Sequence, residues 1–119
     1  MLEMKTIVSE IGSQALSEKE PIVILFGETA TPALRNYSVI QEMKDSEPVE
    51  LKKAGKILFD GEEYTIQFVG KTANQNLQSI GHLTLIFDKV PEENQIVNGV
   101  YLTPYKVPAF KKNTEIIYL

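Results

Sequence analysis

The sequence contains no cysteine, no tryptophan and a single histidine, His82, among its 119 residues. Without cysteine the chain has neither a disulfide framework nor a thiolate metal site. One histidine without cysteine also argues against a transition-metal site, which takes several nitrogen or sulfur ligands. We therefore expect no metal, and we expect no cofactor. Chains without cysteine suit a reducing compartment, so we expect a cytoplasmic location.

Long apolar runs are absent as well. The longest, Pro21 to Phe26, is far shorter than the roughly 20 residues that a membrane helix needs. The N-terminus lacks a basic region followed by an apolar segment, so we expect no signal peptide. The net charge of −4 opposes general nucleic-acid binding, which depends on neutralising phosphates. These features predict a protein that is not membrane-embedded and has no nucleic-acid partner.

The chain does carry many short runs with strand periodicity. Its length suits one domain with its own core, so we expect residues 1–119 to form one domain. Asp60-Gly61 lies between two strand-like runs and is typical of a tight hairpin turn. No internal repeat is visible. The expected strands lie at 4–11, 22–26, 37–43, 56–59, 62–69, 83–87, 99–103 and 114–119, and a further extended segment is expected between Pro104 and Pro108. We predict an all-β fold, a single barrel-like domain of short, mainly antiparallel strands with one or two short helices.

One of these helices leads into the segment that contains His82. Thr72 and Gln75 have the spacing of a capping box, and Gly81 is suited to end the helix in a left-handed conformation. After it, Leu83, Leu85 and Phe87 alternate with less apolar residues, which predicts a strand with one buried face. His82 is thus expected at the mouth of a strand, where catalytic side chains are often found. A second short helix is expected after Thr31-Pro32.

The same segment carries most of a family resemblance. The helix-to-strand block contributes Gly70, Ala73, Asn76-Leu77, Gly81-His82, Thr84-Leu85 and Phe87-Asp88. Further matches, in order along the chain, are Ile11-Gly12, Leu25-Phe26, Lys53-Ala54-Gly55, Tyr64, Val69, Gly99-Val100 and Leu102. Together they resemble the glucitol/sorbitol-specific enzyme IIA components of the bacterial phosphoenolpyruvate-dependent sugar phosphotransferase system.

The resemblance implies a small cytoplasmic β-barrel that relays a phosphoryl group during glucitol/sorbitol-type sugar uptake. The donor would be the histidine-containing phosphocarrier protein, and the recipient the IIB part of a IIB/IIC permease. One position departs from the family. Its acceptor histidine, on the strand after the first short helix, falls here on Gln41, and a carboxamide cannot accept a phosphoryl group in this way.

Two interpretations therefore stay open. Either His82 becomes the phosphohistidine, or the chain is a non-catalytic relative that acts as a binding or regulatory module. Whether the protein is an enzyme depends on this choice. An acceptor needs a neutral ring nitrogen with a free lone pair that another protein can reach. Gly81 would permit that close approach.

For an acceptor we expect a partly exposed ring with one nitrogen oriented by a neighbour and the other facing solvent. We expect Thr84, two residues along the strand, to share its face and donate a hydrogen bond. Lys71 and Thr72, at the helix start, would help to bind an anion if the fold brings them close. A ring with both nitrogens buried and bonded inside the protein would instead be structural. Unpaired strand edges would also make a homodimer plausible.

Overall fold

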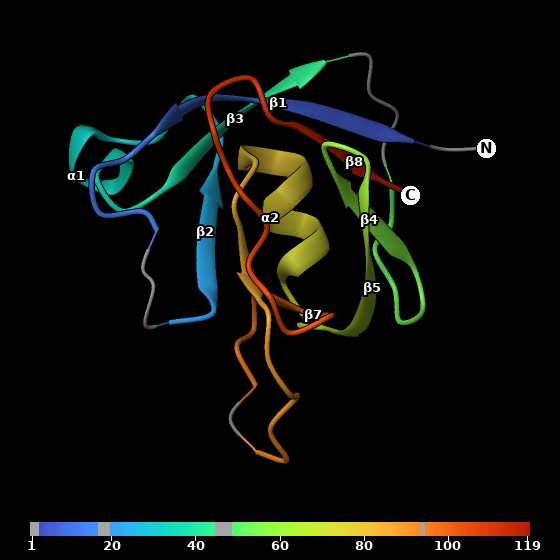
Figure 1. Ribbon diagram of the computed structural model, residues 1–119. Helices are drawn as coiled ribbons and strands as arrows, with labels where there is room; N and C mark the ends of the chain where they lie inside the picture. The colour runs from blue at the N-terminus through green and yellow to red at the C-terminus, as the bar shows by residue number, and fades with distance from the viewer. Residues whose placement is uncertain (1–2, 17–19, 45–48, 94) are drawn as a thin grey trace.

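Eight strands close into a barrel in the computed structural model, which describes residues 3–16, 20–44, 49–93 and 95–119 (Figure 1). The strands are β1 (Met4–Ile11), β2 (Ile22–Phe26), β3 (Val39–Lys44), β4 (Lys56–Phe59), β5 (Glu62–Val69), β6 (Leu83–Ile86), β7 (Gly99–Thr103) and β8 (Glu115–Tyr118). Two helices, α1 (Pro32–Arg35) and α2 (Ala73–Ile80), connect them. The predicted all-β, barrel-like fold class is confirmed.

The strand order around the barrel is β1-β3-β2-β6-β7-β5-β4-β8. Six of its pairings are antiparallel, and β2–β3 and β6–β7 are parallel. Closure gives each of these strands a neighbour on both sides, so none of them presents an unpaired edge. The argument for a homodimer from open strand edges therefore does not apply.

The two halves of the barrel share one topology. Exchanging β1 with β5, β2 with β6, β3 with β7 and β4 with β8 turns every pairing into an observed pairing of the same direction, and the β2–β6 and β4–β8 pairings into themselves. The irregularity between Val8 and Glu10 in β1 recurs between Ile66 and Phe68 in β5. The chain thus contains a structural repeat with an approximate twofold relation that its sequence does not display.

A glycine follows the first strand of each half, Gly12 half-buried after β1 and Gly70 buried after β5. The N–H of Gly12 donates to the Ser38 carbonyl at 2.9 Å, and the N–H of Gly70 donates to the Gly99 carbonyl at 2.8 Å. A Cβ atom at Gly12 would overlap the backbone carbonyl of Arg35, and one at Gly70 would overlap that of Val97. The matching contacts pair Gly12 with Gly70 in the repeat, and both positions exclude any side chain.

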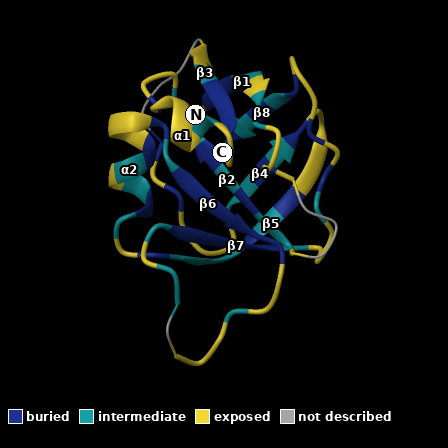
Figure 2. Ribbon diagram, turned by 90° about the vertical axis from the view of Figure 1, so that its left-hand side faces the viewer, coloured by how far each residue is buried: buried dark blue, intermediate teal, exposed yellow. Residues whose placement is uncertain are grey.

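The barrel interior is apolar in one half and partly polar in the other. In the apolar half, the Tyr64 ring contacts the rings of Phe59 and Phe87 edge-on, each with a centroid separation of 5.3 Å. In the other half three buried polar side chains, Thr6, Gln41 and Tyr118, form hydrogen bonds with one another. Figure 2 shows β6 as buried along its length and β7 as buried over most of it, whereas residues 88–93 and 95–98 project from the barrel.

The helices begin and end much as the sequence predicts, with one exception. At α1, the Thr31 hydroxyl accepts from the Leu34 N–H and proline follows at the first helical position. At α2, Gly81 ends the helix with φ 66°, in the left-handed region. Thr72 is the N-cap but makes no side-chain capping bond, so the predicted capping box is wrong. Its hydroxyl donates instead to the Val97 carbonyl at 3.1 Å.

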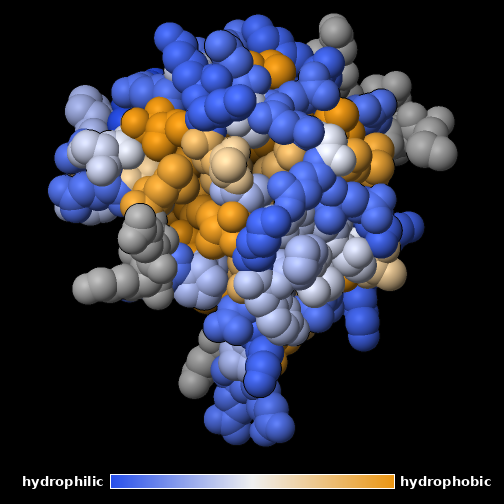
Figure 3. Space-filling view, viewed as in Figure 1, coloured by the Kyte–Doolittle hydropathy of each residue, from blue (hydrophilic) through white to orange (hydrophobic). Residues whose placement is uncertain are grey.

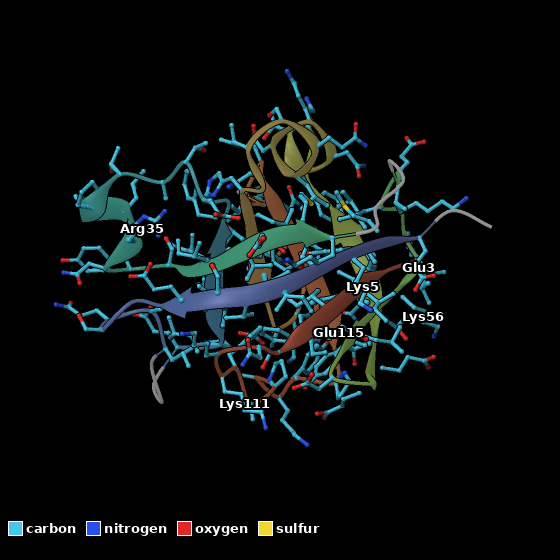
Figure 4. All side chains as sticks on the ribbon, turned by 90° about the horizontal axis from the view of Figure 1, so that it is seen from above. Glu3, Lys5, Arg35, Lys56, Lys111 and Glu115 are labelled. Carbon is cyan, nitrogen blue, oxygen red and sulfur yellow. The ribbon has the colours of Figure 1, made fainter. Side chains whose placement is uncertain are left out.

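Several ion pairs link elements on the barrel surface, and Figure 4, seen from above, labels Lys5, Glu115 and Arg35, which belong to two of them. Lys5 of β1 pairs with Glu115 of β8 at 3.0 Å. Arg35, the last residue of α1, pairs with Glu10 of β1 at 2.6 Å and also donates to the Glu28 carbonyl. Exposed pairs of this kind contribute about 0–1 kcal/mol each. Arg35 therefore contributes mainly by holding the β2–α1 loop, through its hydrogen bonds to the Glu28 and Ala30 carbonyls.

We expect the protein to lose stability as the pH rises above about 10. Burial and the neighbouring Glu62 raise the pKa of Tyr64 from 10.0 to about 12, and burial raises the pKa of Tyr118. A phenol whose folded pKa is raised ionises first in the unfolded chain. Its stabilising effect is complete below pH 10 and is lost as the pH rises toward the folded pKa. Each pKa unit corresponds to about 1.4 kcal/mol.

Urea unfolding midpoints at pH 8, 10 and 11 measure this loss. Tyr118→Phe should be about 1 kcal/mol less stable at pH 8, because it lacks the hydroxyl bond to Gln41. It should also lose less stability than the parent between pH 8 and 11. An identical pH dependence in the two proteins would contradict the assignment.

Candidate functional site around His82

His82 lies between the left-handed Gly81 and the first residue of β6, as the sequence predicts. Leu83 and Leu85 are fully buried in the core. Because side chains alternate along a strand, His82 and Thr84 point to the outer face of the barrel. The ring of His82 is half-buried on that face and packs on Phe26 of the neighbouring β2, with centroids 4.4 Å apart and planes 30° apart.

Both ring nitrogens of His82 have partners. Nδ1 lies 3.1 Å from the Leu25 carbonyl oxygen, and Nε2 lies 2.7 Å from Nδ2 of Asn98. A carbonyl oxygen only accepts, so Nδ1 must carry a hydrogen. With the Asn98 amide nitrogen donating, Nε2 is the acceptor. The contacts therefore define the neutral tautomer with its lone pair on Nε2.

The geometry expected for an acceptor histidine is found at Nδ1 but not at Nε2. A backbone neighbour orients Nδ1, as expected for an oriented imidazole. Nε2 does not face open solvent, because the amide of half-buried Asn98 occupies its lone pair. Both nitrogens are thus bonded within the protein, as expected for a structural histidine, but the ring is only half-buried, as expected for an acceptor.

Thr84 lies where the sequence places it. It pairs with Ile24 of β2, is 8% exposed and shares the outer strand face with His82. Its backbone N–H donates to the Asn98 carbonyl at 3.1 Å, which holds Asn98 against β6. Within the described residues the Thr84 hydroxyl forms no hydrogen bond. It is thus a donor without a partner beside His82.

Lys71 and Thr72 are not brought to the His82 ring. They precede α2, whereas His82 follows it, and eight helical residues span about 12 Å. The Thr72 hydroxyl and N–H both bond the Val97 carbonyl. Lys71 is exposed and lines a cavity of about 150 Å³ with Ile96 and Val97. Thr72 and His82 instead contact neighbouring residues of one segment, since Thr72 bonds Val97 and His82 bonds Asn98.

Gln41, at the position of the family's acceptor, is 1% exposed inside the barrel. Its Oε1 accepts from the hydroxyls of Thr6 and Tyr118, each at 2.7 Å. Its Nε2 donates to the Gly81 carbonyl at 2.8 Å. Its amide is thus bonded on both sides and reaches the residue directly before His82.

An open cavity of about 350 Å³ lies beside this position. Its lining combines β3, the loop after β2 and the end of α2: Gly27, Glu28, Thr29, Gln41, Glu42, Met43, Gln78, Ser79, Ile80 and Gly81. The lining contains two carboxylates and no basic side chain, so it does not favour a phosphate. Across the described chain, no three histidine, aspartate or glutamate side chains gather as a metal site would need.

Sequence reasoning missed Asn98, Phe26 and the Leu25 carbonyl as members of the site. Leu25 and Phe26 belong to β2, and Asn98 precedes β7; β2 and β7 are the two strands that pair with β6. Only the strand order brings them together. The Asn98-Gly99 pair reads in the sequence as an ordinary turn before a strand, so no local signal points to its contact with the histidine.

This barrel belongs to a known class of protein. The family model described as "PTS system glucitol/sorbitol-specific IIA component" matches residues 3–117, and the chain belongs to that family. It is similar to a crystal structure titled as a PTS system IIA component from Enterococcus faecalis V583. That similarity has 44% identity and a TM-score of 0.90, over 98% of this chain and 99% of the other. No curated protein sequence matches the chain significantly.

The family membership confirms the resemblance seen in the sequence and gives the chain a phosphotransferase-system context. Among the described residues, no helix is long and apolar enough to cross a membrane.

Proposed function

We propose that the protein is a cytoplasmic phosphocarrier that relays a phosphoryl group through Nε2 of His82. The donor is the histidine-containing phosphocarrier protein, and the recipient is the IIB part of a glucitol/sorbitol-type permease. The observation that supports this most directly is the bond from Nδ1–H to the Leu25 carbonyl. It fixes the tautomer in which Nε2 has the lone pair that a nucleophile needs.

In the transfer step, the Nε2 lone pair attacks the phosphorus atom of the donor's phosphohistidine. The N–P bond of the donor breaks as the new N–P bond forms, and the donor nitrogen keeps the electron pair. The Asn98 amide must leave Nε2 before attack. Asn98 is half-buried, and its side chain can turn without breaking the backbone bond from Thr84. The amide and the Thr84 hydroxyl then supply donors for the phosphoryl oxygens, the main protein contribution to such transfers.

An apolar surface beside the ring fits a protein partner. The outward side chains of β2, Ile22, Ile24 and Phe26, are only half-buried. Figure 3 shows apolar side chains gathered over β2 on this face of the barrel. A phosphocarrier must admit two different proteins to one histidine in turn. A modest apolar surface that borders the histidine suits such short-lived contacts.

Incubation with phosphoenolpyruvate, enzyme I and the phosphocarrier protein tests the proposal. The intact protein should gain the mass of one phosphoryl group, and mild acid should remove it, as expected for phosphohistidine. A known acceptor in the same mixture confirms that the donors are active. If that acceptor is loaded while this protein gains no mass, the phosphocarrier proposal fails.

A non-catalytic binding or regulatory module is the second candidate. It is favoured by the bond between Asn98 and Nε2, together with the replacement of the family acceptor by buried Gln41. Such a module would bind a phosphotransferase-system protein without gaining mass in the same assay. Titration of the labelled protein with the phosphocarrier protein or IIB, followed by NMR, would detect that binding.

A further inference from the structure

The backbone just before His82 departs from the twofold relation of the barrel. At one end of the β2–β6 pair, the Phe87 N–H donates to the Pro21 carbonyl at 2.8 Å and so extends the ladder of backbone bonds. The equivalent bond would join Gly27 to the Gly81 carbonyl. Instead, Gly27 donates to the Ile80 carbonyl at 3.0 Å, because the left-handed Gly81 shifts the ladder by one residue. The Gly81 carbonyl therefore loses its backbone donor.

The Gln41 side chain supplies the missing donor. Its Nε2 bonds the Gly81 carbonyl at 2.8 Å, in place of the backbone N–H. Its Oε1 is held from the opposite side by the hydroxyls of Thr6 and Tyr118. All three side chains are at most 1% exposed. An amide with both ends bonded in this way has one orientation, so the Gly81 carbonyl is held by a fixed donor.

The fold itself does not demand this polar cluster. By strand register, Thr6, Gln41 and Tyr118 correspond in the other half to Tyr64, Leu102 and Phe59. Those three fill the same places with apolar contacts, including the Tyr64–Phe59 ring pair. At these equivalent positions, side chains that hydrogen-bond one another occur in the half that meets Gly81 and His82, whereas the Tyr64 hydroxyl of the other half donates to the Lys106 backbone carbonyl.

We propose that Gln41 is a positioning residue for His82. This inference rests on the proposed phosphocarrier function. Gln41 holds the Gly81 carbonyl, which sets the direction of the chain into His82. This chain direction places the His82 ring so that Nδ1–H donates to the Leu25 carbonyl, which leaves the lone pair on Nε2. The residue at the family's acceptor position thus no longer carries the phosphoryl group but orients the histidine that does.

The test uses the other half of the barrel as a template. The triple variant Thr6→Val, Gln41→Leu, Tyr118→Phe removes the polar cluster and takes two of its residue types from positions 102 and 59. Because all three partners leave together, no hydroxyl is left unpaired, and the variant should remain folded. Only the Gly81 carbonyl loses a partner. Thr6→Val alone is the matched control, since it leaves the Gln41–Gly81 bond in place.

Two readouts separate positioning from stability. The first is the rate of phosphorylation by the phosphocarrier protein at a temperature where all variants are folded. We expect the triple variant to be slower by about 10- to 100-fold, as for a misoriented nucleophile, and the control to be nearly unchanged. The second is the imidazole ¹⁵N spectrum of His82. The single Nδ1–H tautomer should become a mixture in the triple variant only.

The outcomes distinguish the two proposals. If the parent protein gains no phosphoryl group, the phosphocarrier proposal fails, and the ¹⁵N spectrum still tests whether Gln41 sets the tautomer. If the parent is phosphorylated and the triple variant matches it in rate and spectrum, the role of Gln41 is refuted. Gln41→Met, which keeps a long side chain without the amide, provides the same two readouts if the triple variant unfolds.

Discussion

Replacing His82 by asparagine should abolish phosphoryl transfer while the barrel stays folded. The shorter amide can place its Nδ2 near the position of the imidazole Nδ1 and donate to the Leu25 carbonyl. It offers no nitrogen lone pair, because an amide nitrogen is not a nucleophile. His82 is the only histidine in the chain, so no other imidazole can replace it. Intact mass after incubation with the complete donor mixture measures the loss.

His82→Ala should lose the same activity and also stability. Removing the ring leaves the Leu25 carbonyl and the Asn98 amide without their partners, which costs about 1–3 kcal/mol per buried group. Thermal melts of the two variants therefore separate the structural role of the ring from its chemistry. A mass gain in His82→Asn would show that a different residue accepts the group.

Asn98→Ala is the informative control. It keeps the histidine and the Nδ1 bond but frees the Nε2 lone pair from its amide partner. If Asn98 shields the nucleophile, this variant should be phosphorylated at least as fast as the parent in the first step. Complete loss of phosphorylation in Asn98→Ala would instead make its amide essential for binding the phosphoryl oxygens.

The sequence predicted the elements of this fold well because their signals are local. Gly81 ends α2 in the left-handed region, as predicted from a glycine between a helical and a strand pattern. Asp60 and Gly61 adopt the positive φ values, 52° and 84°, that a tight hairpin requires. The His82 strand begins at Leu83, one residue after the histidine. Each of these features depends on a few neighbouring residues.

The twofold topology could not be predicted, because equivalent positions hold chemically different residues. Thr6 corresponds to Tyr64 and Gln41 to Leu102, so no repeat is visible in the sequence. Strand order is a long-range property, and the parallel pairings of β2 with β3 and β6 with β7 leave no local mark. For the same reason the partners of His82 stayed hidden: one lies 57 positions away, the other 16.

The anion site expected at Lys71 and Thr72 shows a second limit of prediction from sequence. A helix start does offer free N–H groups, and the helix does exist. The sequence could not show that the 95–98 segment packs on this end and takes the N–H and hydroxyl of Thr72. A local motif predicts which groups are available, whereas the tertiary fold decides which partner they meet.

Alanine at Gly70 or Gly12 should be among the most destabilising substitutions in the chain. In each case the new Cβ would overlap a backbone carbonyl, of Val97 or Arg35, and backbone cannot rotate away as a side chain can. Overpacking of this kind costs about 3 kcal/mol. For a domain of this size that lowers the melting temperature by roughly 10 °C. Thermal melts of the purified variants measure the effect.

Gly61→Ala is the matched control for backbone strain. Gly61 has φ +84°, but nothing lies within 4 Å of the position that its Cβ would take. It should cost only about 1 kcal/mol, the penalty for a side chain in the left-handed region. If Gly61→Ala destabilises as much as Gly70→Ala, strain rather than overlap dominates, and the close approach at Gly70 is unimportant.

The two equivalent glycines should nevertheless differ in their effect on His82. Gly70 packs on Val97, and the next residue, Asn98, bonds Nε2 of His82. Gly12 packs on Arg35 and Asn36, which make no hydrogen bond to the histidine. At a temperature where both variants are folded, only Gly70→Ala should change the ¹⁵N spectrum of His82 and its phosphorylation rate. Equal changes in both variants would mean that the histidine responds to global loosening of the barrel, not to the position of the 96–98 segment.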